Sequence, residues 1–100
     1  MTTFEKINKS DVENIFKSFG VKKASIFGSV ARNEDKENSD IDFVVSFISK
    51  YDLLDIIGLK QELSAKFNRN IDVITEKSIH SKYLKENIYK DAKVIYEYYN

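Results

Sequence analysis

Two short segments decide the fold of this chain: GSVAR at residues 28–32 and SDIDFVV at residues 39–45. In the first, a glycine precedes a serine that opens a predicted short helix, so the backbone can approach an anion and free N–H groups attract it. In the second, Asp40 and Asp42 alternate with apolar residues along a predicted strand. Because side chains alternate along a strand, both carboxylates share one face and the apolar residues share the other. The pattern predicts a sheet with an acidic face and a core face.

Asp40 and Asp42 are costly to place together unless a ligand binds them. Two like charges about 7 Å apart repel by about 2 kcal/mol at an effective dielectric constant near 20, and aspartate is depleted in strands. A divalent cation turns the repulsion into attraction, and hard oxygen ligands indicate Mg²⁺, or Mn²⁺ as an alternative. Asp72, in the β-like run 70–75, is the candidate third acid on a neighbouring strand. The sequence therefore predicts two metal ions at these acids, which can clamp an in-line displacement at phosphorus. The alternative is that Asp40 ends a loop and Asp42 is an exposed strand residue.

Four residues near the acids are candidates for nucleotide binding: Gly28, Ser29, Arg32 and Ser39. Gly28 permits a turn, and the close approach of a phosphate requires it as well. The Ser29 hydroxyl and its neighbouring N–H groups can face the β- and γ-phosphates of a triphosphate, although serine is also a favoured N-cap. Arg32 either contacts the triphosphate or pairs with an acid to orient the site. Ser39 more simply fixes the geometry of the loop.

The whole pattern, from Gly28 to Asp72, resembles the signature of the DNA polymerase β-like nucleotidyltransferases. On so short a chain it is most similar to the minimal nucleotidyltransferases (MNT), antitoxins of the MntA type that are encoded beside HEPN-domain RNase toxins. The resemblance extends over nearly the whole chain. It implies that Asp40 and Asp42 bridge both metal ions, and that Asp72 binds the catalytic metal and assists the nucleophile. One position departs from the family pattern, since Asn33 stands where a glycine is usual. Asparagine tolerates the left-handed backbone region, so the turn can survive.

The resemblance implies a protein adenylyltransferase that moves AMP from ATP to a hydroxyl, with tyrosine expected, of a cognate HEPN toxin and thereby silences it. The chain itself is too small to enclose a bulky acceptor, which favours a protein that brings its own surface. Two alternatives stay open. The chain could neutralise its partner by complex formation alone, with a vestigial nucleotide site. It could instead modify a small molecule, such as an aminoglycoside, with a second subunit completing the acceptor pocket.

The composition agrees with a single small domain over residues 1–100. Hydrophobic residues make up 42% of the chain, which is too many for a disordered segment. There is no cysteine, which excludes disulfides and Cys-based zinc sites and fits a cytoplasmic location. No apolar run suggests a signal peptide or a membrane span. Sixteen basic and sixteen acidic residues give zero net charge, which makes nucleic acid an unexpected direct partner.

The apolar periodicity predicts alternating helices and strands, and therefore an α/β (α+β) fold. A capping box at Ser10 and Glu13 indicates a helix that ends at Gly20. The later elements are a strand at 23–27, a surface loop at 33–38, a strand at 40–47, a helix at 51–67, a strand at 71–74, a helix at 78–90 and an edge strand at 94–98. The expected architecture is a small mixed sheet with helices packed on one face and the acidic active site on the other.

Three tyrosines near the C-terminus, Tyr96, Tyr98 and Tyr99, form a candidate partner-binding patch, because tyrosine is favoured at interfaces. The alternative is that they pack on the core and its rim. His80, the only histidine, is assigned no functional role.

Overall fold

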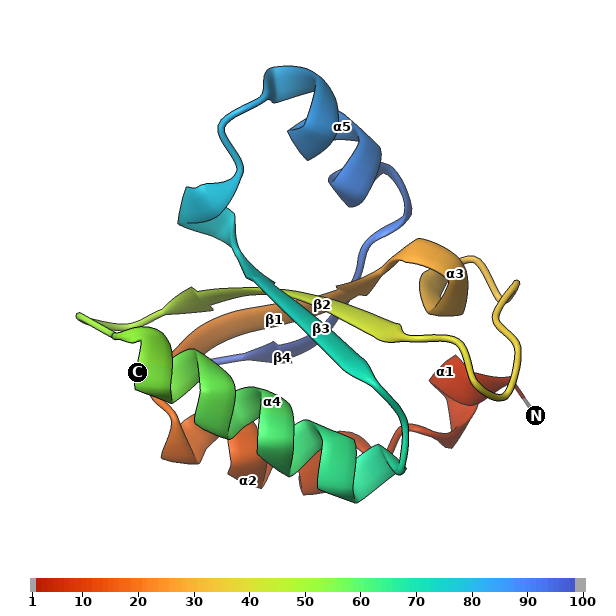
Figure 1. Cartoon of the computed structure of the whole chain (residues 1–100), viewed down its shortest axis with the longest axis horizontal. Helices are drawn as coiled ribbons and strands as arrows, with labels where there is room; N and C mark the ends of the chain where they lie inside the picture. Colours follow the sequence, from red (N-terminus) through yellow and green to blue (C-terminus); the bar gives the residue numbers. More distant parts are fainter. Residues whose placement is uncertain (1, 99–100) are drawn as a thin grey trace.

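A computed structural model describes residues 2–98, and these form a four-stranded sheet with helices on both faces (Figure 1). Tyr99, the last member of the predicted tyrosine patch, lies outside the described residues. In chain order the elements are α1 (Thr3–Lys6), α2 (Lys9–Ser18), β1 (Val21–Phe27), α3 (Gly28–Ala31), β2 (Ile41–Phe47), α4 (Leu53–Phe67), β3 (Ile71–Thr75), the 3₁₀ turn η1 (Glu76–Ser78), α5 (Lys82–Asp91) and β4 (Lys93–Glu97).

The sheet has the strand order β3-β2-β1-β4 and is mixed, as predicted. β1 pairs antiparallel with β2 and with β4, whereas β2 and β3 run parallel. A parallel pair needs a crossover connection, and α4 supplies it. β4 lies at one edge, also as predicted. This topology places the beginnings of β2 and β3 side by side.

One face of the sheet packs against α2 and α4 and forms the main core (Figure 1). Phe16 of α2 is fully buried and contacts Phe43 of β2, with ring centroids 6.0 Å apart. Leu59 and Leu63 of α4 are also fully buried. Each such side chain stabilises the fold by about 1.5–3 kcal/mol relative to an exposed position. These contacts fix one face of β2 against the helices, so the alternate residues of β2 project from the opposite face of the sheet.

The opposite face of the sheet faces α3 and α5 (Figure 1). Asp42 and Asp72 project to this face, because they are paired with each other and their strand neighbours Ile41, Phe43 and Ile71 lie in the core. Helices α2 and α4 thus cover one face, as predicted, whereas α5, which is as long as α2, lies on the acidic face that the prediction left without helices. Val44, on the same side of β2 as Asp42, is buried although it lies outside the main core cluster. The acidic face is therefore covered at Val44, two residues along β2 from Asp42.

Several element boundaries differ from the sequence prediction. α2 begins at Lys9 with Asn8 as its N-cap, so the predicted capping box at Ser10 is wrong. α1 was not predicted, although Thr2 and Glu5 form a capping box at its start. α5 begins at Lys82 with Ser81 as its N-cap, because the predicted starting residue Ser78 belongs to η1. In α2 and α5, the N-cap is a nearby residue, Asn8 or Ser81, which favours this position as much as the predicted serine does.

Two predictions about single side chains also change. Tyr96 is buried in the core and stacks on Phe16, so it cannot belong to a surface patch. Tyr98 is 43% exposed. The helix predicted at 51–67 begins at Leu53, and the Leu53 side chain is exposed at the helix N-terminus. Asn33 has φ of 59°, which confirms that asparagine takes the left-handed turn where the family pattern has glycine.

Among residues 2–98, no helix is both long enough and apolar enough to cross a membrane.

Candidate active site

Asp42 and Asp72 are register partners in the parallel β2–β3 pair. Residues paired across adjacent strands project to the same face, with Cβ atoms roughly 5 Å apart. The two carboxylates therefore lie next to each other on the acidic face. The structure thus brings together two of the three predicted acids through the register of the sheet.

Asp40 lies directly before β2, at the end of the preceding loop, and is exposed. The predicted strand 40–47 therefore begins one residue later, at Ile41. Asp40 is still close enough to Asp42 to raise the pKa of that carboxyl. Burial raises the pKa of Asp42 above its usual value, and the negative charges of Asp72 and Asp40 raise it further. The Arg32 guanidinium opposes this shift. All three predicted acids thus belong to one electrostatic cluster.

Gly28 begins α3 directly beside Asp42. It has φ of 74°, in the left-handed region that favours glycine. A Cβ atom at Gly28 would collide with Asp42 Oδ2 and would lie 3.4 Å from Asp42 Cγ. Gly28 is therefore needed for its backbone conformation and for the space that the carboxylate occupies. The need for a glycine conformation could be predicted from the sequence. The need for space could not, because it depends on how β1 and β2 pair.

Ser29 is the second residue of α3 and not its N-cap, which is Phe27. No side chain within residues 2–98 caps this helix. The capping alternative for Ser29 is therefore wrong, and its hydroxyl is not used to close α3. The Ser29 carbonyl accepts a hydrogen bond of 2.8 Å from the Glu34 N–H, which folds the following loop back onto the helix.

Arg32 ends α3 and pairs with two acids outside the cluster. Its Nε lies 3.4 Å from Glu34 Oε2, and its Nη1 lies 3.5 Å from Asp91 Oδ2 at the end of α5. The Arg32 side chain is 42% exposed, so these long ion pairs contribute little to stability. An exposed guanidinium with such weak partners can turn toward an anion in the site.

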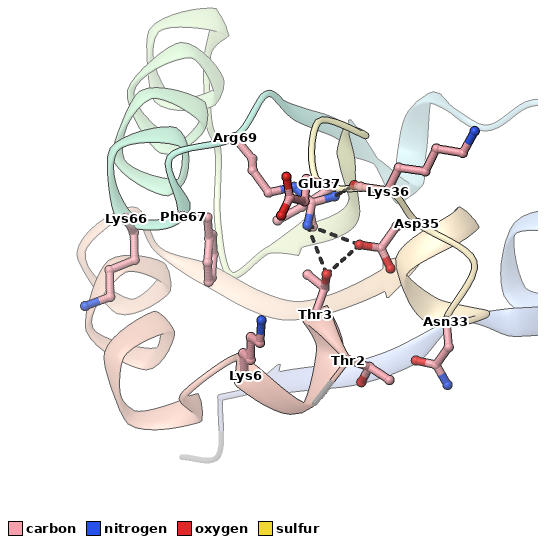
Figure 2. A pocket seen from close by; sticks show the side chains of 11 residues that line it. Thr2, Thr3, Lys6, Asn33, Asp35, Lys36, Glu37, Lys66, Phe67 and Arg69 are labelled. Carbon is pink, nitrogen blue, oxygen red and sulfur yellow. Dashed lines mark hydrogen bonds and ion pairs between the residues drawn. The ribbon is translucent and has the colours of Figure 1, made fainter.

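Ser39 closes the loop before Asp40. Its hydroxyl accepts a hydrogen bond of 2.9 Å from the Lys36 N–H. Its carbonyl accepts two hydrogen bonds from Arg69, a residue that the sequence analysis did not single out. Figure 2 shows Arg69 pointing toward Asp35 and Thr3 as well, in a pocket of about 490 Å³. The sequence signal was weak, since Asp35 and Arg69 are 34 residues apart.

An open hollow of about 570 Å³ lies beside the acids, along α4. Asp40 and Asp72 line it from the sheet, and Ile57, Lys60 and Ser64 line it from the helix. The hollow is open to solvent, so a large acceptor can reach Asp40 and Asp72, while Asp42 is not among the residues that line it.

The donor set of the site consists of carboxylates. Among residues 2–98, no three His, Cys, Asp or Glu side chains converge closely enough to form a complete metal site. The hard oxygens of Asp40, Asp42 and Asp72 nevertheless suit Mg²⁺ or Mn²⁺, and their mutual repulsion favours a cation between them. Mg²⁺ commonly takes only one or two protein carboxylates and completes its shell with substrate phosphates and water. The residues present therefore fit a metal whose remaining ligands are water or, when a nucleotide is bound, its phosphates.

Comparison with known proteins agrees with this geometry. The family model described as "Polymerase beta, Nucleotidyltransferase" matches residues 10–99. This chain belongs to that family. A relative from Methanocaldococcus jannaschii, provisionally named as a protein adenylyltransferase, is 48% identical over 84 residues, which are 84% of this chain and 89% of the relative. The protein adenylyltransferase MntA of Thermococcus cleftensis is 33% identical over 84 residues, which cover 81% of this chain and 85% of that protein. The chain is a nucleotidyltransferase, and its curated relatives are named for the transfer of AMP to proteins.

Solved structures of the family share the fold. A minimal nucleotidyltransferase structure superposes with a TM-score of 0.74 at 30% identity, covering 85% of this chain and 86% of its own. A toxin–antitoxin structure with AMP-PNP gives a TM-score of 0.77 at 20% identity and covers 92% of this chain and 75% of its own. The complex of a tri-AMPylated Shewanella oneidensis HEPN toxin with MNT antitoxin gives a TM-score of 0.67 at 17% identity. The match covers 90% of this chain and 70% of the matched chain. The predicted minimal nucleotidyltransferase fold is thereby confirmed.

Proposed function

We propose that this nucleotidyltransferase is an antitoxin that transfers AMP from ATP to a hydroxyl, expected to be a tyrosine, of a cognate HEPN-domain toxin. The observation that carries the proposal is the pairing of Asp42 with Asp72 on the face where α3 begins. It places paired carboxylates beside a turn that can receive a phosphate. The names of the relatives and the AMPylated toxin of one structural neighbour support a protein acceptor.

The proposed cofactor is Mg²⁺, as two ions held by Asp40, Asp42 and Asp72, with Mn²⁺ as a substitute. Such ions, when bound, lower the pKa of the attacking hydroxyl and neutralise charge on the leaving pyrophosphate. A location in the cytoplasm, where ATP and Mg²⁺ are available, belongs to the same proposal.

The chain's own residues orient the reactants. The acceptor oxygen attacks the α-phosphorus of ATP, the bond from that phosphorus to the bridging α,β oxygen breaks, and pyrophosphate leaves with the bonding electrons. Asp72 is exposed at the edge strand β3 and can accept the hydroxyl proton. In this proposal, the N–H groups at the start of α3 hold the β- and γ-phosphates together with Ser29 and Arg32. The result is an AMP ester on the partner.

The open hollow beside Asp40 and Asp72 favours a protein as acceptor over a small molecule. A small substrate must be enclosed to be oriented and shielded from water. In this site, the described residues leave one side to solvent, and a docked partner protein would supply that wall. Effective catalysis would then require the complex.

A labelling experiment separates this activity from its alternatives. We expect label at the α-phosphate of ATP to appear on the purified HEPN protein, and label at the γ-phosphate to leave as pyrophosphate. A stable complex without transferred label would contradict the proposal and support neutralisation by binding alone. Label transferred to an aminoglycoside, and not to the protein, would support a small-molecule acceptor.

A further inference from the structure

Arg69, in the turn between α4 and β3, joins three separate segments of the chain. Its Nε and Nη2 donate hydrogen bonds of 3.0 and 2.7 Å to the Ser39 carbonyl, and Nη2 also donates to the Lys36 carbonyl at 3.1 Å. Its Nη1 donates to Thr3 Oγ1 at 3.0 Å and to Asp35 Oδ2 at 3.1 Å. A guanidinium has five N–H donors, and these contacts engage all of its nitrogens. Arg69 therefore binds within the protein and does not point at a substrate.

The ion pair between Arg69 and Asp35 is buried, unlike the exposed pairs of Arg32. The two side chains are 13% and 7% exposed. The hydrogen bond from Thr3, together with Arg69, holds the pKa of Asp35 below its usual range against the opposing effect of burial. A buried pair requires good geometry, because unsatisfied charges are costly to desolvate. Figure 2 shows the Arg69 and Asp35 side chains facing each other, with Thr3 beside them.

The consequence concerns Asp40, whose two neighbours are both fixed to the turn that leads into β3. The Ser39 carbonyl, which shares a peptide plane with the Asp40 N–H, is held by Arg69. On the other side, the Ile41 N–H donates a hydrogen bond of 3.0 Å to the Asn70 carbonyl. Asp40 is thus positioned by residues 69 and 70, immediately before the strand that carries the third acid.

We propose that Arg69 is a positioning residue that holds Asp40 in register with Asp42 and Asp72, so that the three carboxylates can bind metal together. The proposal rests on the metal site of the proposed function. Lysine cannot replace the guanidinium, because its point charge lacks the planar fork that donates to one carbonyl from two nitrogens. The role is distinct from that of the acids, since the guanidinium nitrogens of Arg69 are engaged by Thr3, Asp35, Lys36 and Ser39.

The test measures Mn²⁺ affinity by electron paramagnetic resonance, with no nucleotide and no partner, so a failure of AMP transfer does not affect it. The variants are R69K, D35N and the double variant D35N/R69Q, with D42N as the reference for a lost ligand. D35N alone breaks the ion pair but leaves the fork on Ser39. The double variant removes both buried charges, so it remains foldable if R69K does not.

We expect R69K and D35N/R69Q to weaken Mn²⁺ binding at least tenfold, and D35N to stay within threefold of the unmodified protein. We also expect the double variant to unfold at a temperature closer to that of the unmodified protein than R69K does. If the double variant regains the melting temperature but still binds Mn²⁺ weakly, Arg69 positions the metal site and is not merely a structural residue. If metal affinity returns together with stability, or if R69K binds Mn²⁺ as tightly as the unmodified chain, the proposal is overturned. An unmodified protein that binds no Mn²⁺ would overturn it too, together with the metal site.

Discussion

Gly28 and Asp42 are packed so closely that a single added methyl group on Gly28 would overlap the Asp42 carboxylate. This contact joins the turn before α3 to the acids of β2. The turn that we propose to bind phosphate and the strand that we propose to bind metal are therefore one unit, and a change in either shifts the other.

Gly28→Ala is expected to reduce AMP transfer at least a hundredfold and to lower the free energy of unfolding by about 1–3 kcal/mol. The alanine must adopt φ of 74° and displace Asp42 Oδ2. Gly20→Ala is a matched control, because Gly20 has φ of 71° with no atom within 4 Å of an added Cβ. Transfer assays and urea unfolding of both variants measure the difference. Equal losses of activity would show that the Gly28–Asp42 contact is unimportant.

Asp42→Asn is expected to abolish transfer while leaving the protein as stable or up to about 1 kcal/mol more stable at pH 7. Since the folded pKa of Asp42 is raised above 3.8, the folded chain binds this proton more tightly than the unfolded chain. The contribution of Asp42 to the free energy of unfolding therefore falls as the pH rises from about 3.8 through the folded pKa.

The stability advantage of Asp42→Asn should accordingly be largest near neutral pH and shrink as the pH is lowered toward 4. Thermal unfolding of both proteins in metal-free buffer across this pH range is the measurement. A large loss of stability in the variant would mean that Asp42 is a structural residue and would contradict the metal site.

Arg32→Ala separates the two interpretations of this residue. Because its ion pairs are long and exposed, the free energy of unfolding should change by less than about 1 kcal/mol. If Arg32 contacts the triphosphate, as we propose, KM for ATP should rise at least tenfold. Glu34→Gln, which removes one ion-pair partner but keeps the guanidinium, should leave KM within about twofold. A similar rise of KM for ATP in both variants would favour an orienting ion pair over phosphate contact.

Tyr96→Phe should be neutral or stabilise the protein by up to about 1 kcal/mol. The Tyr96 hydroxyl is buried and finds no hydrogen-bond partner among residues 2–98, and such a group carries an uncompensated desolvation cost. Tyr98→Phe, at an exposed position, is the control and should change little. Urea unfolding measures both. Clear destabilisation by Tyr96→Phe would reveal a partner for this hydroxyl.

The sequence predicted the fold class because apolar periodicity and turn residues report local structure directly. Alternation around Asp42 placed its carboxylate opposite the core, and the structure agrees. Helix starts were less certain, because Asn8, Ser10, Ser78 and Ser81 all favour N-caps and only tertiary packing selects among them.

The parts that could not be predicted are those set by pairing between distant segments. The register of β2 on β3, which joins Asp42 to Asp72, has no local sequence signal. The same holds for the contact between Gly28 and Asp42, and for Arg69, which reads as an ordinary surface arginine in a polar turn. These relationships are visible only in the folded chain.

In the function that we propose, the carboxylate cluster catalyses the transfer of AMP to a partner protein. Intact mass spectrometry of the cognate HEPN protein, after incubation with this chain, ATP and Mg²⁺, tests it most directly. Asp42→Asn is compared with Glu62→Gln, which removes one exposed carboxylate of α4 that does not line the hollow. We predict mass additions of whole AMP units with the unmodified chain and with Glu62→Gln, and none with Asp42→Asn. An unmodified HEPN protein recovered in a stable complex, or AMP addition that persists with Asp42→Asn, would contradict the claim.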